Sequence, residues 1–199
     1  MISTMIELRE GTKTVVVIAG ISSYAAPALS LKPRMQLQSL EQILPTVTRL
    51  QSLLDSQRYR TEGIEAVPLG LTSTVDEVRA RLKEIRQALQ QRAGADLNLV
   101  LFWSGHGGLD GGHFRLATPD TYAPIEQEDG LGVEEVLREA GVARVGTCTM
   151  FLDTCHAGAG LEDIFRVVGT KFMAEAPTLR GFGALFASAP TNARGTASS

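Results

Sequence analysis

The sequence predicts an α/β fold in which a mainly parallel sheet lies between two layers of helices. Apolar runs rich in β-branched residues, such as 14–21 (TVVVIAGI) and 97–103 (LNLVLFW), are typical of strands buried on both faces. Segments with a helical apolar stripe alternate with these runs, which indicates βαβ units. A chain of 199 residues can bury a sizeable core, and no linker divides it, so we expect one domain over 1–199.

The individual elements follow from periodicity and from residues that begin or end helices. Thr74 and Glu77 match a capping box at the start of the clearest apolar stripe, and Gly141 ends a shorter helix. Pro68 places its strand end near a sheet edge, and residues 22–36 read as a loop. We expect strands at 14–21, 64–69, 97–103, 147–152 and 183–188, and helices from near Pro45 to Leu54, over 75–91 and over 133–140.

Composition excludes several classes of function. The net charge of −3 and the pI of about 5.7 argue against a nucleic-acid-binding protein. No run approaches the ~18 apolar residues of a membrane helix, and the N-terminus does not have the pattern of a secretory signal. Two cysteines seven residues apart do not form a disulfide framework, so we expect a reducing, cytoplasmic location and no membrane association.

Two predicted strands end in reactive side chains. One runs into Ser-Gly-His-Gly-Gly at 104–108 and the other into Asp-Thr-Cys-His at 153–156. In parallel sheets, function gathers at the carboxyl ends of the strands. His106 precedes Cys155 by 49 residues, so we expect a catalytic dyad in which Cys155 is the nucleophile and His106 transfers protons. We expect the N–H groups of Gly107 and Cys155 to form the oxyanion hole.

These motifs carry a resemblance to a known family. FWSGHGG followed by FLDTCHAGAG resembles the paired His-Gly and Asp-x-Cys-x-x-Gly motifs of the caspase and metacaspase superfamily, and is closer to metacaspases and their bacterial relatives. The resemblance covers residues 14 to about 190. It implies a caspase-like fold and a cysteine endopeptidase that acts on protein or peptide substrates. Under it, 14–182 resembles the large subunit and 183–199 resembles the start of the small one.

The sequence after residue 182 has room for only one strand of the smaller subunit that completes the fold in that family. We therefore expect either that the last C-terminal elements of the fold are absent or that a further domain or subunit completes it. Two other functions stay open. One is an inactive or partner-completed caspase-like regulatory or binding module, and the other is a different thiol acyl-transfer enzyme on a doubly wound sheet.

Asp153 has a functional and a structural interpretation. The resemblance places it in the floor of the primary specificity pocket, which implies substrates with arginine or lysine before the scissile bond. Alternatively, its carboxylate bonds backbone N–H groups at the strand end. In metacaspases a second acid comes from the loop after the first strand, but here the segment 22–31 contains no acid.

Other polar residues are weaker candidates. We expect Cys148 in the core. His106 has a glycine on both sides, whereas His113 and His156 do not, so neither is the expected base. His113 is expected on a hairpin or loop beside the site. The sequence contains no second pair of ligands with the spacing of a zinc site. Some metacaspases need calcium, but no calcium-binding spacing is present. We therefore expect no metal cofactor and a solvated acidic loop formed by Asp120, Glu126, Glu128 and Asp129, with activation by calcium as the open alternative.

Overall fold

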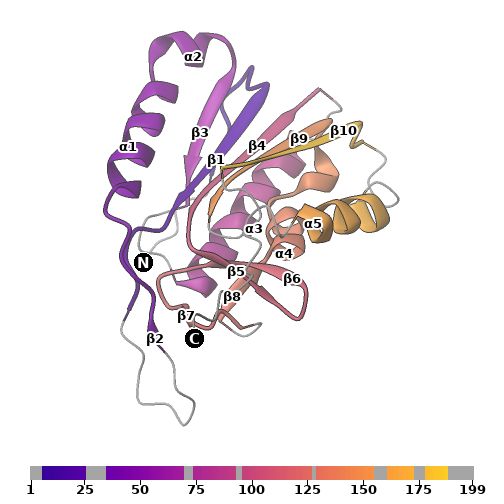
Figure 1. Ribbon diagram of the computed structural model, residues 1–199. Coiled ribbons are helices and arrows are strands. Elements are labelled where there is room, and N and C mark those ends of the chain that lie inside the picture. The colour runs from indigo at the N-terminus through magenta and orange to yellow at the C-terminus, as the bar shows by residue number, and fades with distance from the viewer. Residues whose placement is uncertain are drawn as a thin grey trace, which may run out of the picture.

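The computed structural model describes residues 6–25, 35–69, 74–92, 96–126, 129–154, 161–172 and 178–187. Among them, five strands form one sheet in the order β10-β9-β4-β1-β3 (Figure 1). The strands are β1 (Thr14–Gly20), β3 (Ile64–Pro68), β4 (Asn98–Gly105), β9 (Thr147–Thr154) and β10 (Gly181–Phe186). All neighbouring pairs are parallel, which confirms the predicted α/β class.

Helices cover both faces of this sheet because apolar side chains alternate along its central strands. On β1, Val16 and Ile18 pack with helix α1 (Ile43–Leu54). Val15 and Val17 point to the opposite face and pack with α3 (Val75–Gln91) and α4 (Val133–Glu139). Figure 1 shows α1 on one side of the sheet and α3, α4 and α5 on the other.

The helices agree closely with the sequence pattern. α3 has the predicted bounds, and both hydrogen bonds of the Thr74–Glu77 capping box are present. α4 is followed by Gly141 at φ 81°, in the left-handed region. α1 begins at Ile43, two residues before Pro45, because a proline is tolerated within the first helical turn. The short helix α2 (Gln57–Thr61) was not predicted.

Antiparallel pieces lie at the carboxyl end of the main sheet. Apart from the hairpin or loop expected at His113, they were not predicted. β5 (Gly107–Asp110), β6 (His113–Ala117) and β8 (Gly130–Gly132) form a small sheet. Gly111 and Gly112 join β5 to β6, and both have positive φ, as a tight hairpin turn requires. β2 (Met35–Gln36) pairs with β7 (Tyr122–Ala123), so the predicted loop 22–36 contains a strand.

Several predicted strand ends need correction. β4 and β9 each run two residues further than expected, so Ser104 and Asp153 lie inside strands. β10 begins at Gly181, so the expected boundary between 182 and 183 falls within a strand. β3 is an edge strand that ends at Pro68, as predicted.

The chain continues after β9 through α5 (Leu161–Val167) and a π-helical segment (Val168–Phe172). Among the described helices, none is both long and apolar enough to cross a membrane.

Close packing between β1 and α1 depends on Gly20. A Cβ atom at this position would lie 2.4 Å from Cγ2 of Val47 and 3.1 Å from Cγ2 of Ile43. We expect Gly20→Ala to lower the free energy of unfolding by about 1–3 kcal/mol, the usual cost of overpacking a core. Urea denaturation measures the change. Gly183→Ala is the matched control, because no atom of the described residues lies within 4 Å of a Cβ there. Equal effects of both substitutions would contradict this packing.

Candidate functional site

The register between β4 and β9 aligns the two motifs. Ser104 pairs with Asp153 and Gly105 pairs with Thr154. His106 follows Gly105 directly, and Cys155 is bonded to Thr154. Cys155 and His156 themselves lie outside the described residues. The strand order reverses between β1 and β4, and ligands of open parallel sheets bind at such a reversal.

Three hydrogen bonds hold His106 just past the end of β4. Its Nε2 atom lies 2.7 Å from the carbonyl oxygen of Gln38. A carbonyl only accepts, so Nε2 carries a proton and a neutral His106 has its lone pair on Nδ1. The backbone N–H donates to the Tyr24 hydroxyl at 3.0 Å, and the carbonyl accepts from the Ala117 N–H at 3.0 Å. This arrangement gives the imidazole one defined proton-accepting atom.

The expected oxyanion donor Gly107 lies at the start of β5. It pairs with Leu116 across the β5–β6 hairpin. Because Ala117 donates to the His106 carbonyl, the Gly107–Leu116 pair is of the non-hydrogen-bonded kind. The Gly107 N–H therefore points away from β6. The second expected donor, the N–H of Cys155, lies outside the described residues.

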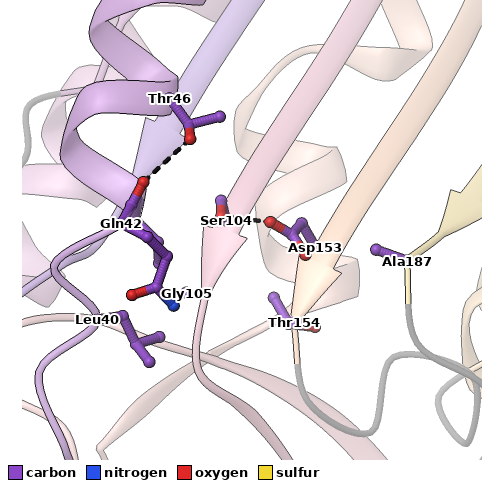
Figure 2. Close-up of a pocket in the computed structure, with 9 residues that line it drawn as sticks. Leu40, Gln42, Thr46, Ser104, Gly105, Asp153, Thr154 and Ala187 are labelled. Atoms are coloured by element: carbon purple, nitrogen blue, oxygen red, sulfur yellow. Dashed lines mark hydrogen bonds between the residues drawn. The ribbon is translucent and has the colours of Figure 1, made fainter.

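Asp153 lies in a pocket at the carboxyl end of the sheet (Figure 2). The pocket has a volume of about 240 Å³. Ser104, only 1% exposed, donates its hydroxyl to Oδ2 of Asp153 at 2.8 Å. The carboxylate is thus anchored by a side chain on the neighbouring strand. The backbone N–H groups of the structural alternative belong to the segment after Thr154, which lies outside the described residues. Within the described part of the chain, no arginine or lysine forms an ion pair with Asp153.

The opposite wall of this pocket comes from the start of α1 and the residues just before it. Leu40 and Ile43 supply aliphatic surface, while Gln42 and Thr46 supply an amide and a hydroxyl. In Figure 2 the Gln42 amide points toward the end of β4. Among the residues that the structure describes, no second carboxylate lines the pocket. The segment 22–31 contains no acid either, and the residues that form this wall were not predicted from the sequence.

The other histidine within the described residues is not placed as a base for this pocket. His113 lies on the predicted hairpin, at the start of β6, and its side chain is 56% exposed. Its Nδ1 atom is 3.4 Å from Asp163 on α5, and this carboxylate also accepts from the Phe114 N–H at 3.0 Å. Asp163 therefore joins the hairpin to α5, a role that the sequence did not reveal.

The acidic loop has a partly structural role, which corrects the expectation of a solvated loop. Oδ1 of Asp120 accepts from the N–H of Val75 at 3.0 Å and from the Thr118 hydroxyl at 2.6 Å. Asp120 thus caps α3 together with Thr74. Glu128 lies outside the described residues. No cluster of three or more metal-ligating side chains occurs among the residues that are described.

Cys148 lies in the core, as predicted, and is 1% exposed. Burial raises the pKa of its thiol to about 12. At pH 8 it therefore remains almost wholly protonated, and a protonated thiol is a poor nucleophile.

The burial of Cys148 predicts that an alkylating reagent will react selectively with Cys155. We expect iodoacetamide at pH 8 to modify Cys155 at least about 100-fold faster than Cys148, because the thiolate is the reactive species. Peptide mass mapping over time measures both rates, and Cys155→Ala gives the rate for Cys148 alone. Comparable rates at the two cysteines in the folded protein would contradict the burial of Cys148 or the activation of Cys155.

Comparison with known proteins adds no further assignment. The chain matches no protein-family model, and no curated protein is significantly similar to it. The caspase-like relationship therefore remains a prediction from the two motifs.

Proposed function

We propose that the protein is a cysteine endopeptidase of the caspase-like fold, with His106 and Cys155 as its catalytic dyad. The observation that carries the proposal is the register of β4 and β9, which pairs the residue before His106 with the residue before Cys155. The proposal requires no cofactor. It includes a cytoplasmic location, because a reducing compartment keeps the catalytic thiol free.

The geometry around His106 supports a definite sequence of proton transfers. Nδ1 of His106 accepts the proton of the Cys155 thiol, and the sulfur attacks the carbonyl carbon of the scissile bond. The N–H groups of Gly107 and Cys155 stabilise the oxyanion. Nδ1 then returns the proton to the departing amine, which leaves a thioester on Cys155. Water, deprotonated by the same nitrogen, hydrolyses the thioester and restores the thiol.

The pocket around Asp153 favours a basic side chain before the scissile bond. The Ser104 hydroxyl donates to Oδ2 of Asp153. The pocket opens between this carboxylate and the wall at the start of α1. A guanidinium can bond the carboxylate in a fork and lay its flat face on Leu40 and Ile43. A lysine ammonium is a compact point charge without the planar pair of parallel N–H donors, so it cannot bond the carboxylate in a fork. The proposed preference is therefore arginine first and lysine second.

A partner-completed module is the second candidate, and an uncovered apolar surface favours it. Phe151 on β9 and Leu185 on β10 are 37% and 55% exposed. Together with Phe102 and Phe186 they line an apolar groove of about 230 Å³ next to the Asp153 pocket. α1 packs on β1 but leaves this part of the same face open. Under this candidate, the isolated chain shows no turnover until a second polypeptide covers the groove.

The fold alone does not separate these functions from other thiol chemistry. Numbered in chain order, the five strands follow 2-1-3-4-5, an arrangement shared with flavodoxin-like sheets. A different thiol acyl-transfer enzyme would use the same two residues. Peptide-bond cleavage, measured directly, distinguishes a peptidase from that alternative.

The dyad predicts a specific ranking of substitutions. We expect Cys155→Ala to lower kcat by roughly 10⁴–10⁶-fold, because covalent catalysis is lost. His106→Ala should cost about 10²–10⁴-fold, the usual worth of proton transfer. Hydrolysis of a fluorogenic arginyl peptide measures both. His113→Ala is the matched control and should change kcat less than about twofold; a greater loss for His113→Ala than for His106→Ala would overturn the assignment.

The pocket predicts a charge-dependent preference. We expect Asp153→Asn to lower kcat/KM for arginyl peptides by roughly 10–100-fold, because a charged hydrogen bond is lost. Peptides that differ only in arginine, lysine or the neutral isostere citrulline measure the effect. Wild type should favour arginine over citrulline, and Asp153→Asn should nearly abolish the difference. Asp110→Asn on β5 removes the same charge away from the pocket. An unchanged preference in Asp153→Asn would refute the pocket assignment.

A further inference from the structure

We propose that Tyr24 is a positioning residue, which fixes both the main chain and the ring plane of His106. Its consequence for turnover rests on the proposed function, whereas its effect on the imidazole does not. Tyr24 follows β1 and is 4% exposed. It comes from the loop that crosses the carboxyl end of the sheet beside β4.

The Tyr24 hydroxyl bridges two strands. It donates its proton to the carbonyl of Ile21 at 3.0 Å, and it accepts from the N–H of His106 at 3.0 Å. The Ile21 N–H in turn donates to the Ser104 carbonyl at 2.9 Å. The hydroxyl thus ties the main chain of His106 to the end of β1, where the β1–β4 ladder has stopped.

The ring of Tyr24 also contacts the imidazole. The two ring centroids are 4.9 Å apart with an interplanar angle of 47°. Gly105 permits this approach, since a Cβ atom there would lie 3.2 Å from the Tyr24 hydroxyl and 3.4 Å from Cβ of Ile21. A side chain at 105 would therefore press on the hydroxyl that holds His106 and require a shift of a few tenths of an ångström.

The segment that carries Tyr24 is itself fixed at several points. The Tyr24 carbonyl accepts from the Gln36 side-chain amide at 2.6 Å, and the Ala25 N–H donates to the Pro119 carbonyl at 2.7 Å. Gln38, two residues beyond Gln36, accepts from Nε2 of His106. One loop therefore holds the backbone of His106 through Tyr24 and its ring nitrogen through Gln38, and these contacts together set the direction of Nδ1.

The test is Tyr24→Phe, which removes the hydroxyl and keeps the ring. We expect kcat for an arginyl peptide to fall about 10–100-fold while KM changes less than about twofold, because misdirection of Nδ1 slows chemistry and leaves the Asp153 pocket intact. Tyr59→Phe is the matched control, on α2 and away from the site. It should leave kcat unchanged, and thermal unfolding should show both variants folded.

A second readout needs no substrate. Imidazole ¹⁵N chemical shifts of His106 should show the Nε2–H tautomer in the neutral wild-type protein and a mixture of tautomers in Tyr24→Phe. Gly105→Ala should cause the same change by displacing the hydroxyl, and it provides the test if Tyr24→Phe fails to fold. Unchanged ¹⁵N shifts in these variants would overturn the proposal. So would a loss of kcat that Tyr59→Phe shares. If wild type lacks turnover that depends on Cys155, the proposed function fails, and the ¹⁵N shifts still decide the role of Tyr24.

Discussion

The parallel pairing of β4 with β9 is the constraint on which the site depends. Every pair in this register is separated by 49 residues, from Asn98–Thr147 to Gly105–Thr154. His106 and Cys155 have the same separation. Side-chain hydrogen bonds fix the register at both ends: Thr147 donates to Asn98 at 2.6 Å, and Ser104 donates to Asp153 at 2.8 Å. A slip of one residue would turn Asp153 to the opposite face and break both bonds.

Three other elements surround His106 and the Asp153 pocket at the end of this pairing. α1 covers β1 and supplies one wall of the Asp153 pocket, while the loop after β1 holds His106 from one side and the β5–β6 hairpin holds it from the other. Asp163 joins that hairpin to α5, the helix that follows the segment containing Cys155. At the apolar groove, Phe151 on β9 and Leu185 on β10 remain exposed on the face of the sheet that α1 covers at β1.

Sequence patterns predicted what local periodicity controls. The apolar stripe and capping box of α3 and the buried runs of β1 and β4 are local signals, and the structure has them within two residues. The Gly111–Gly112 pair is typical of a hairpin turn, and from the sequence we placed His113 on a hairpin or loop without predicting the strands on either side. The pocket wall at Leu40–Thr46 and the contact of Tyr24 with His106 were not predictable, because they join residues far apart in the chain through tertiary packing.

The central claim is that the register brings an activated Cys155 to His106 beside an acidic pocket. Its most direct test is covalent labelling with an arginyl acyloxymethyl ketone, which forms a thioether only with an activated thiol as its carboxylate departs. The account predicts one adduct per chain, located on Cys155 by mass spectrometry, and much slower labelling in His106→Ala and with the citrullyl analogue. An adduct on Cys148, or equal labelling of wild type and His106→Ala, would contradict it.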